Sequence, residues 1–254
     1  MPDKCSSKSA VDRTGKALRD GNLSEETLVL LEDYRQSFDS AYRDVVGVCT
    51  KSLRLSVVGR PAKSTPSIVD KLRRQSIRLS QIQDIAGCRI VVPDRPNQES
   101  VVFALGVLFR NAEIDSKLEV PTHGYRAVHV IVPGDVERLV EIQVRTRLQH
   151  LWAELSEKLA DLFDPLVKYG RGPEEIQKFL ILLSDGIRYF EDTEMARDSF
   201  FRELSRLPAR QQRSRTKEIR RAERSYKSQR ERLLNILSNV LSDDFGGSAN
   251  DFSD

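Results

Sequence analysis

The chain has little cysteine, no long apolar run and no signal-peptide core, and each shortage excludes a class of protein. Its three cysteines, Cys5, Cys49 and Cys88, form neither an even disulfide framework nor a metal-binding spacing. No apolar stretch approaches the roughly 20 residues that span a bilayer. A protein of the cytoplasm, with no segment in the membrane, is therefore expected.

Length and composition indicate one sizeable domain with helical extensions. The 254 residues are 39% hydrophobic and 31% charged, which is typical of a soluble globular protein rich in helix. No internal repeat is present. Cys88 alternates with Ile90 in an apolar run, so we expect it to pack as a small hydrophobic residue.

Polar groups are interleaved with apolar ones in two extended segments. Residues 124–129 read Gly-Tyr-Arg-Ala-Val-His, and residues 141–146 read Glu-Ile-Gln-Val-Arg-Thr. A period of two places the valines at 128, 130 and 132 on one face, and Tyr125 with His129 on the other. It likewise separates Val140, Ile142 and Val144 from Glu141, Gln143 and Arg145. A solvated strand face is the alternative interpretation of these three polar residues.

An upstream segment supplies basic side chains and a helix start. Arg60 and Lys63 precede Ser64-Thr65-Pro66-Ser67, where Ser64 or Thr65 is a plausible N-cap and Pro66 suits the first turn. Free backbone N–H groups beside cationic side chains attract polyanions. An ordinary capped helix with solvated basic residues is the alternative.

A carboxylate stands at the start of a third segment, Asp84-Ile-Ala-Gly-Cys-Arg89-Ile-Val-Val92. Two carboxylates together with phosphate oxygens are a usual way for proteins to hold Mg2+. Asp84 and Glu141 are therefore candidate ligands for Mg2+. Turn formation is the alternative duty for an aspartate shortly before glycine.

Taken together, these motifs resemble the synthetase domain of the RelA/SpoT family of nucleotide pyrophosphokinases, over about residues 50–170. The matching pieces follow in order: Arg60 with Lys63-Ser64-x-x-Ser67-Ile68, Asp84-Ile-Ala-Gly-x-Arg89-Ile90, Gly124-Tyr125-Arg126-Ala127-x-His129, Glu141-Ile-Gln-Val-Arg-Thr146 and Trp152-Ala-Glu154. The resemblance implies an α+β fold with a mixed sheet of about five strands flanked by helices, as in nucleotidyltransferases. It also implies transfer of the β,γ-pyrophosphate of ATP to a ribose 3′-hydroxyl.

The resemblance also implies roles for individual residues. Arg60, Lys63 and Ser67 would hold the triphosphate of ATP, and Arg89 would lie near its adenine or phosphates. Asp84 and Glu141 would bind magnesium, and Glu141 would also help to activate the acceptor hydroxyl. Tyr125 would stack on the acceptor base. His129, Gln143 and Arg145 would line the same acceptor cleft.

The chain departs from the family pattern mainly on the acceptor side. Two residues separate Arg60 from Lys63, where the family usually has one. Long family members often have lysines shortly before the Gly-Tyr motif, whereas no cation follows Lys117 here until the motif. None of the three histidines is followed by aspartate, so the hydrolase activity of long family members is not expected.

The predicted organisation has four parts. Residues 1–22 form a flexible N-terminus, and residues 23–170 form the synthetase domain, with one amphipathic helix from Ser24 to about residue 50. Residues 171–242 form a helical extension, in which a long helix starts at Pro173 and ends before Pro208. Residues 243–254 form a disordered acidic tail. Within the domain, helical spacing of leucines around Trp152 makes this ring a core residue rather than a ligand platform.

Positive charge is concentrated in residues 202–232. This segment has twelve Lys or Arg and four Glu, a net +8 in a chain whose total is +3. Such a field attracts a phosphate backbone, although a solvated helix is an equal alternative. An apolar patch at residues 233–241 follows, which would dock back onto the chain or form a homo-oligomer.

Three functions remain open at this stage. The first is a small alarmone synthetase that uses ATP and GDP or GTP. The second is a pyrophosphokinase of the family's toxin-like branch, which modifies the 3′-CCA end of tRNA and is neutralised by an antitoxin. The third is an inactive nucleotide- or RNA-binding module, which the carboxylate pair argues against.

Overall fold

The computed structural model describes residues 7–134 and 138–242, without the side chains of residues 210, 213–215, 217 and 218. The chain divides into two compact units. Unit 1 comprises residues up to Val92, Gln98–Leu118 and Ala127–Arg145, and unit 2 comprises Pro93–Asn97, Glu119–Arg126 and the residues from Thr146 onwards. The predicted disorder of residues 243–254 lies outside the described residues.

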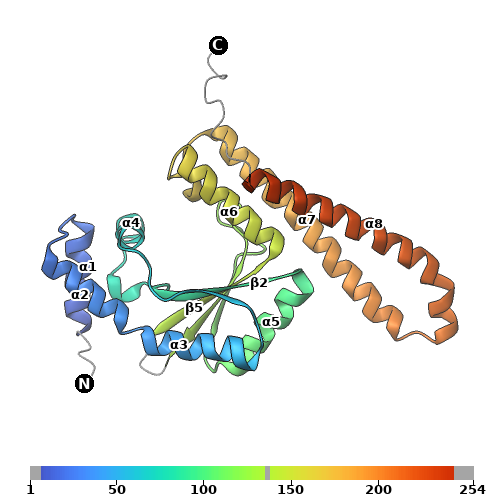
Figure 1. Cartoon of the computed structure of the whole chain (residues 1–254), viewed down its shortest axis with the longest axis horizontal. Coiled ribbons are helices and arrows are strands. Elements are labelled where there is room, and N and C mark those ends of the chain that lie inside the picture. The colour runs from blue at the N-terminus through green and yellow to red at the C-terminus, as the bar shows by residue number, and fades with distance from the viewer. Residues whose placement is uncertain (1–6, 135–137, 243–254) are drawn as a thin grey trace, which may run out of the picture. The chain divides into compact units, whose positions relative to one another are not determined.

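Unit 1 is built on a five-stranded mixed sheet, which confirms the predicted α+β fold (Figure 1). Its strands are β1 (Val57–Arg60), β2 (Ala86–Val92), β3 (Glu113–Ser116), β4 (Val128–Pro133) and β5 (Leu139–Thr146). They lie in the order β1-β2-β5-β4-β3. The pairs β1–β2, β3–β4 and β4–β5 are antiparallel. The two strands with the polar motifs, β2 and β5, are therefore central neighbours.

One face of the sheet carries the main hydrophobic core. The predicted alternation holds, because every second residue of β2, β4 and β5 is buried in one cluster: Cys88, Ile90, Val92, Val128, Val130, Val132, Val140, Ile142 and Val144. Helices α3 (Asp39–Gly47) and α5 (Arg95–Leu108) contribute Ala41, Val45 and Leu105 to it. Each fully buried Val or Ile side chain stabilises the fold by about 1.5–3 kcal/mol. The polar groups of β5 and His129 lie on the opposite face, together with the buried Ile131.

The expected flexible N-terminus is wrong for residues 8–19, which form helix α1 (Lys8–Arg19). The Ser7 side chain caps this helix, and Val11, Thr14 and Leu18 are buried on its inner face. Gly15 lets the helix approach Leu79, whose Cβ lies 2.5 Å from where a glycine-replacing Cβ would stand. The apolar stripe of α1 is short and lies among polar residues, so its helical period is weak in the sequence.

The single helix predicted from Ser24 to about residue 50 is also wrong in its middle. Ser24 caps α2 (Glu25–Gln36) as expected, but α2 ends there, and α3 and the π-helical turn η1 (Val48–Ser52) follow. The Ser37 hydroxyl donates to the Tyr34 carbonyl at 2.6 Å, and the Phe38 ring packs edge-on against Tyr34. This local contact ends the helix while the apolar spacing continues.

Unit 2 is helical around its own core. It contains α6 (Arg147–Leu162), the 3-10 turn η3 (Val167–Tyr169), α7 (Glu174–Ser205) and α8 (Ala209–Ser242). Helix α7 begins after Pro173 and ends before Pro208, as predicted. Trp152 is 4% exposed, and its indole N–H donates to the Leu180 carbonyl at 2.8 Å. The prediction of a core role for Trp152 is confirmed.

The apolar patch at residues 233–241 packs inside unit 2. Leu234 and Leu237 are buried among residues of α6 and α7, and Leu233, Val240 and Leu241 are packed against the same cluster. Only Ile236, at 51% exposed, faces solvent. Of the two expectations for this patch, docking back onto the chain is observed, and self-association stays a prediction.

The division between the units falls before α6, whereas the sequence prediction placed residues 147–170 in the synthetase domain.

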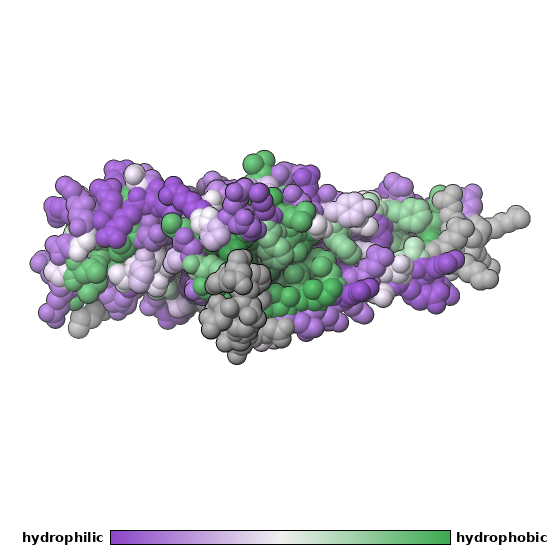
Figure 2. Space-filling view, turned by 90° about the horizontal axis from the view of Figure 1, so that it is seen from above, coloured by the Kyte–Doolittle hydropathy of each residue, from purple (hydrophilic) through white to green (hydrophobic). Residues whose placement is uncertain are grey.

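Within the described residues, no helix combines the length and hydropathy needed to cross a membrane. Hydrophilic side chains cover much of the face drawn in Figure 2, with apolar groups gathered in patches between them.

Candidate active site

A basic helix start forms one side of the candidate site in unit 1. Helix α4 (Thr65–Gln75) begins where the sequence predicts, with Ser64 as its N-cap and Pro66 in its first turn. The Ser67 backbone N–H donates to Ser64 Oγ at 3.4 Å, and the Ser64 hydroxyl donates to Ser67 Oγ at 2.8 Å. Ser67 is exposed. The remaining N–H groups of the first turn point out of the helix end and favour an anion there.

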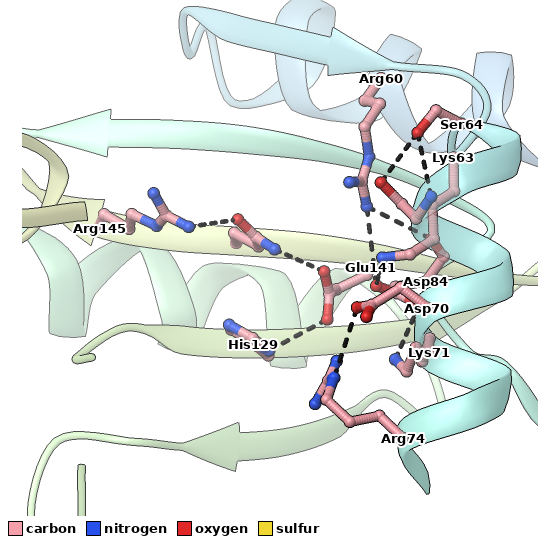
Figure 3. A network of polar contacts seen from close by, with 12 residues as sticks. Arg60, Lys63, Ser64, Asp70, Lys71, Arg74, Asp84, His129, Glu141 and Arg145 are labelled. Atoms are coloured by element: carbon pink, nitrogen blue, oxygen red, sulfur yellow. Dashed lines mark hydrogen bonds and ion pairs between the residues drawn. The ribbon is translucent and has the colours of Figure 1, made fainter. Parts of the chain in front are cut away.

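Three cations surround Asp84 (Figure 3). Lys63 Nζ lies 2.7 Å from Asp84 Oδ2, and Lys71 Nζ lies 2.9 Å from Oδ1. Arg60 donates to the Asp84 backbone carbonyl at 3.3 Å and lies 3.8 Å from its carboxylate. The backbone N–H of Lys63 also donates to the Ile85 carbonyl at 2.7 Å, which ties the basic loop to the start of β2.

These contacts decide the protonation of Asp84. Burial alone raises the pKa of this carboxyl, but the charges of Lys63 and Lys71 outweigh burial and lower the pKa to about 2. Burial lowers the pKa of the Lys63 ammonium, and the Asp84 charge partly restores it. The cluster is thus a carboxylate ionised at neutral pH, with a surplus of positive charge around it.

The polar face of β5 forms the other side of the site. Arg145 Nη2 donates to Gln143 Oε1 at 2.8 Å, and Gln143 Nε2 donates to Glu141 Oε2 at 2.7 Å. From the adjacent strand β4, His129 Nδ1 lies 3.0 Å from Glu141 Oε1. The sequence prediction that these residues share one face is confirmed, because they form a single hydrogen-bonded row (Figure 3).

The carboxylate of Glu141 is buried and electrostatically linked to Asp84. Burial raises the pKa of Glu141, but the hydrogen bond and charge of His129 outweigh it, and the net pKa is lowered. The negative charge of Asp84 opposes this lowering, which means that the two carboxylates are close enough to interact. Figure 3 shows the contacts of Asp84 and those of Glu141 as two neighbouring groups.

The two carboxylates fit a magnesium ion in the type of donor they offer. Hard oxygen ligands, with phosphate oxygens completing the shell, are what Mg2+ prefers. Each Asp84 oxygen is held by a lysine, so an ion would have to replace at least one of these ammonium groups. Among the described residues no three His, Cys, Asp or Glu side chains gather as a ready metal site. The protein thus supplies part of a shell that a bound phosphate would complete.

Gly87 sets how closely the two central strands approach. A Cβ at this position would lie 2.7 Å from the Glu141 backbone carbonyl oxygen and 3.5 Å from the Glu141 Cβ. A real Cβ contact is not made at the first of these distances, so a side chain would push β2 and β5 apart. Glycine at this point lets Glu141 lie against β2 immediately beyond Asp84.

Two further residues of the predicted site, Arg89 and Tyr125, lie in other parts of the structure. Arg89 lies on β2, beside Val58 of β1, and is half-buried. Tyr125 belongs to unit 2 and lies before β4, in a turn where its backbone N–H donates to the Thr122 carbonyl at 3.0 Å. The extended segment predicted for residues 124–129 therefore starts only at Val128. The ring of Tyr125 is half-buried and packs on the core of unit 2.

Sequence reasoning missed Lys71. It stands four residues after Ser67 on α4, so both lie on the same face of the helix. That spacing is visible in the sequence, but the motif matched to the family ends at Ile68 and does not include Lys71. His129 was predicted to line the acceptor cleft. It also holds the Glu141 carboxylate.

Comparison with known proteins agrees with this geometry. Residues 59–160 match the family described as the region found in RelA/SpoT proteins. An uncharacterised protein of Mycobacterium tuberculosis is 35% identical over 181 residues, which are 67% of this chain and 64% of that protein. A GTP pyrophosphokinase of Bacillus subtilis is 36% identical over 116 residues, which are 41% of this chain and 54% of that enzyme. The chain thus spans less than two thirds of the length of these relatives.

Solved structures show the same fold. Small alarmone synthetase 1 of Bacillus subtilis, bound to its product pppGpp, is similar with a TM-score of 0.52 and 26% identity, over 68% of this chain and 96% of that one. A second structure of this synthetase gives a TM-score of 0.54 at 24% identity, over 71% and 100% of the two chains.

Proposed function

We propose that this chain, a RelA/SpoT-family protein by its synthetase domain at residues 59–160, is an ATP-dependent pyrophosphokinase that makes guanosine 3′-pyrophosphates. The acceptor 3′-oxygen of GDP or GTP attacks the β-phosphorus of ATP. The bond from that phosphorus to the oxygen bridging to the α-phosphate breaks, and AMP leaves. The observation that carries the proposal is that a basic helix start holds Asp84, one of two carboxylates that interact electrostatically.

The triphosphate is assigned to the basic side of the site. Lys63 and Lys71 now neutralise Asp84, and a triphosphate offers them more negative charge at the end of α4. Ser67 is exposed in the first turn of that helix and has a hydroxyl free to rotate toward a phosphate oxygen. Arg60 and Arg89 complete the cationic wall. Their charges offset the charge that spreads over the transferred group.

The acceptor hydroxyl is assigned to Glu141. His129 and Gln143 each donate to this carboxylate, which fixes its orientation and keeps it ionised. An ionised, oriented carboxylate can accept the hydrogen bond of a ribose hydroxyl and draw its proton as the bond to phosphorus forms. Arg145 lies at the end of the row and offers a cation to an acceptor phosphate. Tyr125 is the proposed stacking partner of the base.

Mg2+, when bound with ATP, would neutralise phosphate charge, with Asp84 and Glu141 as its protein ligands. The protein's own contribution is then positional. Holding two reactants in line, away from competing water, accounts for much of the acceleration in phosphoryl transfer.

A second candidate acceptor is the 3′ end of tRNA, which one observation favours. Lys117 is the last cation before the Gly124-Tyr125 motif, and its ammonium is 2.8 Å from the Asp115 carboxylate. This leaves little free positive charge for the 5′-phosphates of a guanine nucleotide in this segment. An antitoxin partner belongs to this candidate.

One experiment separates these acceptors. The protein is incubated with γ-labelled ATP and Mg2+, and GDP, GTP, AMP or bulk tRNA is offered separately. The proposal expects label in a guanosine tetra- or pentaphosphate. Label in tRNA alone would replace it with the second candidate, and the absence of label in every acceptor would leave only nucleotide binding.

A further inference from the structure

Helix α8 has two faces with different tasks. Its inner face is committed to unit 2, because Tyr226 donates its hydroxyl to the buried Glu194 and Arg230 Nε donates to the same carboxylate at 2.9 Å. One and two turns later, Leu234 and Leu237 are buried. These contacts hold α8 in place and fix which side chains must face solvent.

The outer face carries a stripe of exposed cations, which we call the basic stripe: Arg220, Arg221, Arg224, Lys227 and Arg232. Several other cations of unit 2 have acidic partners, such as Arg202 at 2.6 Å from Asp198 and Lys178 at 2.6 Å from Glu174. Among the described side chains, no member of the basic stripe lies within 4 Å of a carboxylate oxygen. Its charge is therefore available to an external anion.

We propose that the basic stripe binds the phosphate backbone of a nucleic acid. Arg220, Arg224 and Lys227 follow at intervals of four and three residues on one side of the helix, so they span about 10 Å along its axis. A row of cations at this repeat matches a linear polyanion better than a compact one. The same outer face also exposes Ser225, Ser228 and Gln229, whose polar groups can donate to phosphate and sugar oxygens.

The composition of this face disfavours other macromolecules. A helix that lies in a membrane surface needs an apolar face with large side chains, whereas Ala222 is the only exposed apolar residue described between 219 and 232. The core of a protein–protein interface likewise needs aromatic or aliphatic anchors. The leucines of α8 are packed inside unit 2 and supply neither.

The basic stripe shares no residue with the proposed synthetase site: the stripe belongs to helix α8 of unit 2, and the contacts of Asp84 and Glu141 belong to unit 1. The proposal does not depend on which acceptor is used. Binding can therefore be measured apart from label transfer, and a failure of either proposal leaves the other standing.

The test uses the full chain and a quadruple variant with Arg220→Gln, Arg221→Gln, Arg224→Gln and Lys227→Gln. The probes are fluorescein-labelled 20-mers of poly(U) and of duplex DNA, bulk tRNA and phosphatidylserine vesicles. Anisotropy, or co-sedimentation for vesicles, gives affinity at 50–200 mM NaCl. The slope of log K against log salt should flatten by up to about 2.8 for single strands and 3.6 for a duplex. Wild-type affinity for poly(U) should then fall up to about 50-fold more than that of the variant over this range.

A matched control removes four exposed cations from unit 1 with Arg13→Gln, Lys16→Gln, Arg43→Gln and Lys51→Gln, and reaches the same net charge. It should keep the wild-type slope. The proposal is overturned if both variants lose affinity equally, if the stripe variant keeps the wild-type slope, or if wild type binds vesicles but no nucleic acid. An unchanged melting temperature and an unchanged circular dichroism spectrum check that the stripe variant is folded.

Discussion

Replacing Asp84 by asparagine tests whether this carboxylate holds the basic cluster together. The pKa of Asp84 is lowered from 3.8 to about 2 by the two lysines. At 1.36 kcal/mol per pKa unit, ionised Asp84 contributes about 2 kcal/mol to folding at neutral pH. The side chain is only 12% exposed, so water screens little of this interaction. Asp84→Asn should therefore lower the free energy of unfolding by about 2 kcal/mol.

The lowered pKa of Asp84 determines how its stabilisation of the fold changes with pH. A carboxyl whose pKa is lower in the folded state stabilises the fold above its unfolded pKa, and this stabilisation is lost as pH falls through the folded pKa. The difference between wild type and Asp84→Asn should thus be constant from pH 5 to 8 and shrink between about pH 4 and pH 2. Carboxyls that do not interact with Asp84 titrate alike in both proteins and cancel in the difference.

Urea unfolding followed by circular dichroism at pH 7 and pH 3 measures both quantities. Asp44→Asn, which changes an exposed carboxylate of α3, is the matched control and should shift stability by less than about 0.5 kcal/mol. Equal stability of Asp84→Asn and wild type at pH 7 would refute the reasoning. So would a difference as large at pH 3 as at pH 7.

Three further outcomes follow from the same contacts. Glu141→Gln should reduce pyrophosphate transfer about a hundredfold or more while circular dichroism stays unchanged; near-normal turnover of labelled ATP would remove Glu141 from the mechanism. Tyr125→Ala should weaken acceptor binding by roughly 1–3 kcal/mol and Tyr125→Phe should not, whereas equal loss of ATP affinity in calorimetry would indicate a structural role. Burial raises the pKa of Glu191, so its stabilisation is lost as pH rises through that pKa. Glu191→Gln should accordingly flatten the decline of melting temperature from pH 5 to 8, and parallel curves would contradict this.

The strands and the site could be predicted because their signals are local. Alternation along β5 separates buried Val140 and Ile142 from Glu141 and Gln143, and this period follows directly from strand geometry. The start of α4 could be predicted because Ser64 and Pro66 act through their own backbone neighbours. In both cases the residues that form the pattern are also those that make the contacts.

The remaining features depend on contacts distant in sequence. Helix α1 has only a short apolar stripe, and it is ordered by burying Val11 and Leu18 in one cluster with the distant Leu79. The pairing of Lys71 with Asp84 joins two elements 13 residues apart. The apolar stripe at residues 233–241 was ambiguous for the same reason, because burial against α6 and exposure to a partner require the same spacing.

Gly87 constrains the site by the space it leaves between β2 and β5 and not by any functional group. Because a Cβ there would stand 2.7 Å from the Glu141 carbonyl oxygen, the smallest possible enlargement, to alanine, acts as a wedge between β2 and β5. The wedge would displace Glu141 from Asp84 while leaving every acid and base of the site present. An engineer who wished to abolish the proposed transfer and keep the cations of the site would choose this position, since spacing alone would be lost.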